Sequence, residues 1–272
     1  MAAIGLGLGL IFGSFLGALV VRWPQGRSVL GGRSVCDGCG RPLSAWELVP
    51  LLSFMLCRGR CRSCGGQIDK AHILMEAGCG VIGTAAMILA GQAVMAHTFM
   101  AGAVVAEPVM HVLLAALPLA AAWMVLGWAL LTLALLDARY YWLPDAITLP
   151  LLFLGLTIGP WVTGVTLQDA LIGAAIGYGS LLVVAMGYRR LRGRDGLGLG
   201  DAKLLGALGA WMGCQVLPFI LLLASVAALL WVIGRKIMGA DINATTRIAF
   251  GTFLCMAALP AQFLMQHLLM RG

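Results

Sequence analysis

The chain has 272 residues, of which 61% are hydrophobic and only 11% are charged, and its formal net charge is +7. A soluble domain carries roughly a quarter charged residues, whereas the mean hydropathy here is +0.97. These values exclude an ordinary soluble enzyme and indicate that lipid is the main solvent for most of the chain.

The first apolar stretch runs from Ile4 to Val21 and ends in Arg22. A cleaved signal peptide normally starts with a basic segment, which this stretch lacks. We therefore expect a retained first transmembrane helix over residues 1–21, with its positive end in the cytoplasm. A cleaved signal peptide is the alternative.

Residues 22–72 form the large polar loop of the chain and carry two C-x-x-C pairs with 21 residues between them. Four thiolates at this spacing are typical of a closed tetrahedral zinc site, and the glycines beside them let the backbone turn so that two sulfurs reach one ion. A disulfide pair or a redox C-x-x-C is the alternative, although thiols in a cytoplasmic loop stay reduced. The predicted zinc ligands are Cys36, Cys39, Cys61 and Cys64.

We expect a structural role for this zinc, because so short a loop buries little apolar surface and four cysteine ligands leave no open coordination position. The other cysteines lack such spacing and are expected to pack as small apolar residues: Cys57, Cys79, Cys214 and Cys255. The histidines also lack metal-ligand spacing and are expected near the membrane interface: His72, His97, His111 and His267.

Further apolar segments follow the polar loop, and about 20 apolar residues are needed for one helix to cross a bilayer. The predicted fold is an all-α polytopic membrane protein with about eight transmembrane helices and a small cytoplasmic zinc-binding domain. The sixth span is short and either covers half the membrane or continues into the seventh through Gly213. The expected spans lie near residues 4–21, 73–96, 110–136, 146–163, 168–188, 202–213, 216–234 and 248–269.

Local signals mark several of these helices. Thr166 and Asp169 form a capping-box pattern before the fifth span, and Pro144 with Asp145 is typical of the start of the fourth. Gly173 and Gly177 form a small-xxx-small pair, which predicts close helix packing in lipid.

Charge predicts the orientation. Basic residues fill the first loop and then alternate later loops, whereas the loops near 97–109 and 164–168 contain no Lys or Arg. Under the positive-inside rule the basic loops are cytoplasmic, so that with eight spans both termini are periplasmic. Arg271, at the end of the chain, is the exception. The basic set consists of Arg22, Arg27, Arg33, Arg41, Arg58, Arg60, Arg62, Lys70, Arg139, Arg189, Arg190, Arg192, Arg194, Lys203, Arg235, Lys236 and Arg247.

Two aspartates lie at the predicted cytoplasmic ends of spans. Asp137 closes the third span, and Asp201 opens the sixth within Gly-Leu-Gly-Asp. We expect them to meet in one site, where an ionised carboxylate takes a proton from water and a protonated one polarises a carbonyl group. Gly198 and Gly200 leave a backbone free of side chains, against which an extended substrate can lie.

Structural roles for these aspartates are the alternative. Asp201 could simply cap its helix. Asp137 could form an ion pair with Arg139 or Lys203. The sequence leaves these interpretations open.

Three other acidic residues are candidates for functional or structural roles. Asp145 follows Pro144 and is interpreted as an N-terminal capping residue. Asp195 lies in a basic loop and is expected to be solvated. Glu76 lies just inside the second span and is interpreted either as a buried partner of an arginine or as a substrate-site group.

Taken together, these motifs resemble the bacterial type IV prepilin peptidases, also called leader peptidases, over nearly the whole chain. The resemblance is carried by the order of short segments that are individually weak. They are Gly13-Ser14-Phe15-Leu16, Arg22-Trp23-Pro24, Ser34 to Cys39, Pro50-Leu51-Leu52-Ser53, Arg58-Gly59-Arg60-Cys61, Asp137, Leu143-Pro144-Asp145, Thr148-Leu149-Pro150, and Gly198 to Lys203 with Leu204 to Trp211.

The resemblance implies an intramembrane aspartic protease that removes the basic leader of type IV prepilins or type II secretion pseudopilins at the cytoplasmic face of the bacterial inner membrane. It implies catalysis by Asp137 and Asp201, structural zinc, and N-methylation of the new N-terminus from S-adenosylmethionine. Residues 73–272 are then the transmembrane peptidase domain, in contact with lipid and without a nucleic-acid partner. The oligomeric state is left open.

Two departures from the family pattern are visible. Gly17 stands where an asparagine is usual, and Ala249-Phe250-Gly251-Thr252 stands where Pro-Phe-Gly-Pro is usual. Neither departure affects an aspartate. Chemistry alone assigns no residue to methyl transfer.

Two other classes of function compete with this interpretation. A transporter would carry its ionisable groups at mid-membrane near helix breaks, whereas the two aspartates are predicted at span ends. A non-catalytic assembly scaffold would use the zinc-stapled loop as a partner surface.

Overall fold

The computed structural model describes the chain except residues 30, 32, 101–107, 194, 195, 242, 244, 245 and 270–272, and except the side chains of 108, 109 and 266–269. Regular structure in the described part is helical, apart from two isolated β-bridges. The chain divides into two compact units, Met1–Thr132 and Leu133–Gly272.

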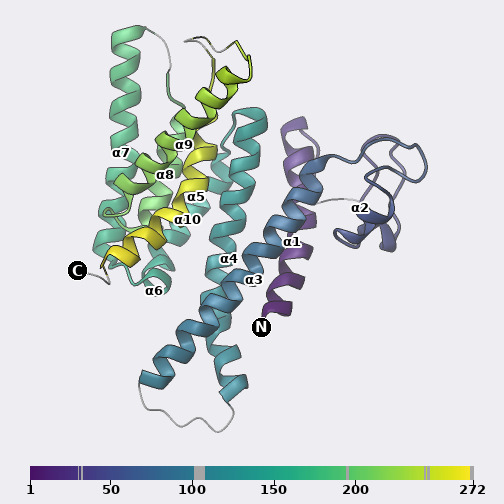
Figure 1. The fold of residues 1–272 in the computed structure, drawn as a ribbon, viewed down its shortest axis with the longest axis horizontal. Coiled ribbons are helices and arrows are strands. Elements are labelled where there is room, and N and C mark those ends of the chain that lie inside the picture. Colours follow the sequence, from purple (N-terminus) through teal and green to yellow (C-terminus); the bar gives the residue numbers. More distant parts are fainter. Residues whose placement is uncertain are drawn as a thin grey trace. The chain divides into compact units, whose positions relative to one another are not determined.

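The first unit pairs two long helices with the cysteine loop. Helix α1 lies side by side with α3, and the loop between them forms a small irregular body (Figure 1). The described part of the loop contains two 3₁₀ helices and the short α2. The elements are α1 (Ala2–Arg22), η1 (Trp23–Gln25), η2 (Ala45–Leu48), α2 (Leu52–Leu56), α3 (Lys70–Met100) and the start of α4 (Pro108–Tyr140).

A glycine stripe on α1 allows α3 to approach closely. A Cβ atom at Gly9 would collide with the carbonyl group of Cys79, and one at Gly13 would lie 2.7 Å from the Cα atom of Glu76. Backbone-to-backbone packing of this kind stabilises helix pairs in lipid, where apolar burial contributes little.

The second unit surrounds one buried helix. Helix α8 packs against α5, α7 and α10, and most of its residues are buried. The indole Nε1–H of Trp211 on α8 donates to the carbonyl oxygen of Leu151 on α5 at 2.8 Å. The elements after α4 are α5 (Asp145–Thr157), α6 (Gly159–Thr163), α7 (Leu167–Arg192), α8 (Leu199–Met212), α9 (Leu217–Ile237) and α10 (Phe250–Leu269).

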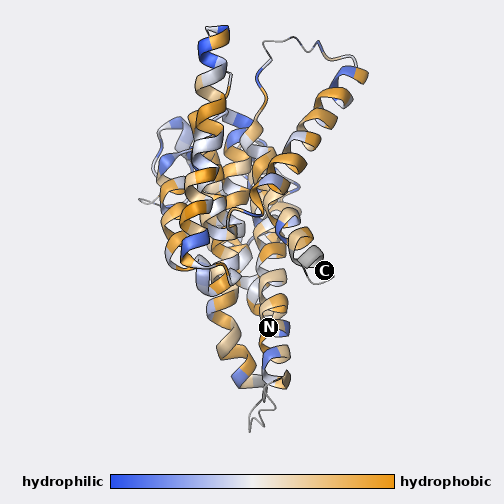
Figure 2. Ribbon diagram, turned by 90° about the vertical axis from the view of Figure 1, so that its left-hand side faces the viewer, coloured by the Kyte–Doolittle hydropathy of each residue, from blue (hydrophilic) through white to orange (hydrophobic). Residues whose placement is uncertain are grey.

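Among the described residues, five helical segments are long and apolar enough to cross a membrane, and the protein is a multi-pass membrane protein. Two shorter apolar helices, Asp145–Thr157 and Phe250–Met265, accompany them. Figure 2 shows that hydrophobic residues make up most of each long helix. Hydrophilic residues lie mainly near the helix ends and in the segments that connect the helices. The five segments are Ala2–Gln25, Lys70–Met100, Met110–Tyr140, Leu167–Arg192 and Leu217–Ile237.

Each expected span is helical in the structure, although the fourth is divided into α5 and α6. The all-α fold is confirmed, whereas the count of eight spans stays a prediction. Helix α8 has 14 residues, which at 1.5 Å per residue is shorter than the bilayer core.

Two local predictions are confirmed. The Thr166 hydroxyl oxygen accepts the N–H of Asp169 at 3.1 Å at the start of α7. A Cβ atom at Gly173 would collide with the carbonyl oxygen of Gly209 on α8, so this glycine allows close helix packing.

Candidate functional site

Asp137 and Asp201 face one small gap in the second unit. Asp137 lies near the C-terminal end of α4, and Asp201 is the third residue of α8. Their exposed fractions are only 5% and 7%. A Cβ atom built on Gly251 would lie 3.0 Å from Oδ2 of Asp137 and 2.9 Å from Oδ1 of Asp201. A single carbon atom would therefore touch both carboxylates.

The start of α10 supplies donors to both aspartates. Oδ2 of Asp137 accepts the backbone N–H of Thr252 at 2.7 Å, and the Thr252 hydroxyl oxygen lies 3.1 Å from the same atom. The Asp201 carboxylate faces the backbone N–H groups of Gly198 and Gly251. The first N–H groups of a helix have no partner inside it, so α10 can direct them at acidic groups.

A cavity of about 700 Å³ opens beside the pair. Gly198 and Gly200 line it together with both aspartates, as do Tyr188 and Arg247. A Cβ atom at Gly200 would lie 2.9 Å from the Cβ atom of Leu143, so glycine leaves room at this wall. Within the described residues, the cavity offers space for an extended peptide segment beside the carboxylates.

The structure bears on the ion-pair and capping roles that the sequence left open for the aspartates. The ammonium group of Lys203 lies 2.7 Å from both carboxylate oxygens of Asp145, not against Asp137. Asp145 does begin α5, but its carboxylate binds Lys203 in place of a capping role. Asp201 lies beside the N-cap residue Gly198 as well as facing Asp137, and the α8 N-terminus has no side-chain capping hydrogen bond. Asp195 lies outside the described residues.

The four predicted zinc ligands come together in the first unit. The Sγ atoms of Cys36, Cys39, Cys61 and Cys64 all lie within 4.8 Å of one another. A tetrahedral zinc ion with Zn–S bonds of about 2.3 Å holds its sulfurs about 3.8 Å apart, and the Cys36 and Cys64 sulfurs are 4.0 Å apart. The arrangement therefore fits zinc.

Two similar backbone turns build this cluster. Gly40 N–H donates to the Cys36 carbonyl and Gly65 N–H to the Cys61 carbonyl, each at 2.9 Å, and both glycines have positive φ. Backbone N–H groups of Cys64 and Ser63, with the Cys36 thiol, lower the pKa of Cys61 to about 6. A lowered pKa favours the thiolate at Cys61, which is the form that binds metal. The neighbouring Cys61 and Cys39 sulfurs instead raise the pKa of Cys64 to about 11.

Ion pairs attach the cysteine loop to the membrane helices. The Arg22 guanidinium at the end of α1 lies 3.2 Å from Asp37 and donates to the Val35 carbonyl at 2.8 Å. Arg27 approaches Asp37 to 3.0 Å. His72 Nε2, at the start of α3, is 4.0 Å from Asp37. The Arg22 contacts hold the first C-x-x-C turn against α1. His72 reaches the turn from α3, but burial lowers the pKa of His72 and so disfavours a charged partner there.

A second network stiffens the loop between the two turns. The Glu47 carboxylate accepts the backbone N–H of Ser44 at 2.9 Å and pairs with Arg41 at 2.6 Å. The Ser44 N–H and the Arg41 guanidinium lower the pKa of Glu47 to about 2.

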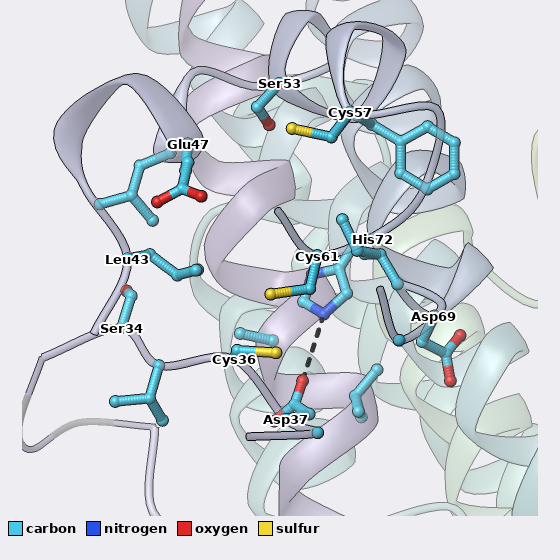
Figure 3. A pocket seen from close by; sticks show the side chains of 18 of the residues that line it. Ser34, Cys36, Asp37, Leu43, Glu47, Ser53, Cys57, Cys61, Asp69 and His72 are labelled. Carbon is cyan, nitrogen blue, oxygen red and sulfur yellow. Dashed lines mark ion pairs between the residues drawn. The ribbon is translucent and has the colours of Figure 1, made fainter. Parts of the chain in front are cut away.

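A cavity of about 390 Å³ lies between this loop and the adjacent ends of α1 and α3. Figure 3 shows Cys36, Cys61, Glu47 and His72 around it. Glu76, which is 7% exposed, lines the cavity, and its Oε2 accepts the N–H of Leu51 at 2.7 Å. The structure thus places Glu76 in the first unit and gives it a backbone partner in place of an arginine.

The remaining cysteines differ from one another. Cys79 and Cys255 are buried, as expected for small apolar residues. Cys57 and Cys214 are only partly buried. Cys57 lines the cavity of the first unit and accepts the Nε–H of Arg62 at 3.2 Å.

Sequence reasoning did not identify Gly251 and Thr252 as site residues. The departure from Pro-Phe-Gly-Pro marked their segment as unusual. That departure did not indicate that α10 would place Gly251 and Thr252 beside the two aspartates.

The fold and the site define a class: a multi-pass helical membrane protein with a buried aspartate pair that opens to a cavity. Residues 124–233 match the model of the Type IV leader peptidase family, and residues 8–90 match that of the Bacterial Peptidase A24 N-terminal domain. The chain belongs to the type IV leader peptidase family.

Relatives extend this likeness over most of the chain. A protein of Pseudomonas putida is 36% identical over 92% of this chain and 86% of its own length. Proteins of Pseudomonas aeruginosa (35%, with 92% and 86% covered) and Klebsiella pneumoniae (38%, with 81% and 89% covered) are also similar. All three are named prepilin leader peptidase/N-methyltransferase. No solved structure matches the chain.

Proposed function

We propose that this chain is an aspartic endopeptidase that removes the leader from type IV prepilins or type II secretion pseudopilins and N-methylates the new N-terminus. One observation carries the peptidase half: Asp137 and Asp201 face the same gap, at the edge of a cavity that can admit a peptide. Family membership supports this activity over a transporter or a non-catalytic scaffold.

The two carboxyl groups account for every proton transfer in the hydrolysis of the peptide bond by one water molecule. The ionised aspartate takes a proton from water while the water oxygen bonds to the scissile carbonyl carbon, and the protonated aspartate gives its proton to the carbonyl oxygen. The C–N bond then breaks. The proton held by the first aspartate passes to the leaving nitrogen, and the second aspartate recovers its proton.

The backbone at Gly198 and Gly200 contributes space to this reaction. Without side chains it lets an extended substrate segment lie within reach of the pair. A substrate helix that docks through its apolar surface would unwind at this end.

Leader removal by single variants tests the proposal. Asp137→Asn and Asp201→Asn should each abolish the gel shift of a co-expressed prepilin. Full cleavage by either variant would remove that residue from the catalytic pair.

We also propose that Cys36, Cys39, Cys61 and Cys64 hold a structural zinc ion. The sulfur separations and the two turns support it. Metal analysis of the purified protein should find zinc that a Cys36→Ser, Cys39→Ser double variant lacks. Equal zinc in both proteins would exclude the site.

The cavity of the first unit fits S-adenosylmethionine, the methyl donor that the names of the relatives imply. Its volume lies in the range of small-molecule sites. Asp69 and Glu76 would face the cationic part of the donor, and Arg22 and Arg27 its carboxylate. When bound, the donor supplies the methyl group. The residues of the chain bind it and exclude water.

Binding without turnover tests this assignment. Titration calorimetry with S-adenosylhomocysteine should show binding to the wild type and to Asp137→Asn, and weaker binding to Glu76→Gln. Equal affinity in the wild type and Glu76→Gln would remove Glu76 from the donor site.

The topology completes the proposal. We infer a first transmembrane helix over residues 1–21, a cytoplasmic zinc-binding domain over 22–72 and a transmembrane peptidase domain over 73–272 in the bacterial inner membrane, with periplasmic termini. The basic loops support this orientation. Cysteine accessibility at introduced loop positions, read with a membrane-impermeant reagent, tests it. The proposed partners are prepilins or pseudopilins and lipid, without nucleic acid.

A further inference from the structure

Thr252 makes three contacts that the peptidase proposal does not use. Its backbone N–H donates to Oδ2 of Asp137 at 2.7 Å. Its hydroxyl oxygen lies 3.1 Å from that same Oδ2 and 3.1 Å from the carbonyl oxygen of Ala134, one turn earlier on α4. Thr252 therefore ties the start of α10 to the catalytic end of α4.

The amide contact has a fixed direction. A backbone N–H can only donate, so Oδ2 of Asp137 must accept. Donors to a carboxylate oxygen stabilise the charged form of the group. Thr252 is the third residue of α10, where the N–H has no partner within the helix, so this donor is available without loss of a helical hydrogen bond.

The hydroxyl contact can take two directions. The Ala134 carbonyl only accepts, whereas a hydroxyl has one proton and also accepts. When Asp137 is ionised, the hydroxyl donates to its Oδ2. When Asp137 has taken a proton on Oδ2, the hydroxyl can turn to donate to Ala134 and accept from Asp137. The equal distances allow both arrangements without movement of the helices.

Asp201 has different surroundings. It faces backbone N–H groups of Gly198 and Gly251 but has no comparable hydroxyl among its hydrogen-bond partners in the described residues. Other ionisable groups also face the pair or its cavity, so their titration must be separated from that of Asp137. They are Cys255 on α10, Tyr188 on α7, and Tyr141 and Arg247 on connecting segments.

We propose that Thr252 is a positioning residue that holds Asp137 as the ionised member of the pair, which makes Asp137 the base that takes the proton from water and Asp201 the acid. The hydroxyl then follows the proton as Asp137 gains and releases it. This assignment rests on the proposed peptidase function, which leaves the two roles interchangeable.

The pH profile of kcat/KM for leader removal tests the assignment. Thr252→Val keeps the size and the N–H but loses the hydroxyl. Because it weakens support for ionised Asp137, the acidic limb of its profile should move to higher pH by about one unit. Thr252→Ser keeps both donors and should restore the wild-type position of that limb. Thr252→Pro, which loses both donors but suits the first turn of a helix, should move it further than Thr252→Val.

Three results would overturn the proposal. The Thr252→Val profile could change in height but not in position, which indicates a structural role only. Its alkaline limb could instead move to lower pH, as expected if the hydroxyl accepts from a resting, protonated Asp137. Finally, Thr252→Ser could fail to restore the profile.

A second variant covers the case in which Thr252→Val does not fold. Thr252→Ala also loses only the hydroxyl among the two donors and adds no bulk, so its acidic limb should move to higher pH as well, and an unmoved limb overturns the assignment. Failure of the peptidase proposal itself is distinguishable, because an aspartate variant would then still cleave prepilin.

Discussion

Gly251 stands directly against the Asp201 carboxylate: a Cβ atom there would lie 2.9 Å from Oδ1. The same atom would lie 2.7 Å from Cδ1 of Leu143. Real Cβ atoms do not approach oxygen or carbon this closely, so a side chain at this position has to displace the carboxylate, the leucine or the helix.

Gly251→Ala should therefore reduce kcat/KM for leader removal by about 100-fold, the effect expected when a reacting group is displaced by about 1 Å. Gly234→Ala is the matched control, because a Cβ atom at Gly234 on α9 meets nothing within 4 Å. Similar activity in both variants would show that the gap between the aspartates is not needed for the reaction.

Packing between α7 and α8 should depend on Gly177. A Cβ atom there would lie 2.5 Å from the carbonyl oxygen of Leu205. We expect Gly177→Ala to lower the free energy of unfolding by about 1–3 kcal/mol, as overpacking does. Gly179→Ala on the same helix is the control, because its Cβ atom meets nothing within 4 Å. Thermal unfolding in detergent measures both, and equal midpoints would contradict the packing argument.

Zinc removal should open the cysteine loop. The turns around Cys36 and Cys61 contain little buried apolar surface, so the proposed zinc ion would hold them together. A strong chelator should make Arg58, Arg60 and Arg62 accessible to trypsin, with fragments identified by mass spectrometry. Cys57→Ser is the control, since Cys57 lies outside the four-sulfur cluster and this variant should retain zinc and protection. Unchanged digestion after complete zinc removal would argue against a structural metal.

Glu47 should stabilise the loop in a pH-dependent way. Its pKa is about 2 in the folded protein, below the usual 4.5, because the Ser44 N–H and Arg41 stabilise the carboxylate. The stabilisation is therefore present above about pH 4.5 and is lost as the pH falls toward 2. The difference in protease resistance between wild type and Glu47→Gln should be constant above pH 5 and shrink below it. Acid also releases zinc, but it does so in both proteins. Comparing wild type with Glu47→Gln at the same pH therefore removes this contribution from the difference. A constant difference down to low pH would contradict this role.

Asp145 should not take part in leader removal. Its pair with Lys203 is partly exposed, with side-chain exposures of 55% and 31%, and such pairs contribute about 0–1 kcal/mol. Asp145→Asn should cleave prepilin at a rate within a few-fold of wild type and unfold at a similar temperature. Loss of cleavage as complete as in Asp137→Asn would give Asp145 a catalytic role.

Local and compositional features were predictable from the sequence. Apolar runs of sufficient length specify helices in lipid, because every backbone polar group must be satisfied within the segment. The Thr166 cap was predicted from the three-residue spacing to Asp169, and the four-cysteine cluster was predicted from its two C-x-x-C pairs. The glycine pair on α7 also predicted close packing correctly, since only small residues let two backbones approach in this way.

The tertiary structure decided which distant residues share the site. Sequence placed Asp137 and Asp201 at span ends, but only the packing of α10 against the end of α4 brings Gly251 between them and Thr252 onto Asp137. The tertiary structure also pairs Lys203 with Asp145, and it places the Glu76 carboxylate where it accepts the backbone N–H of Leu51. Hydropathy and spacing report on one segment at a time, whereas these contacts depend on how side chains of separate helices fit together. The sequence by itself determined the helices and the cysteine cluster, and helix packing decided the partners of each aspartate.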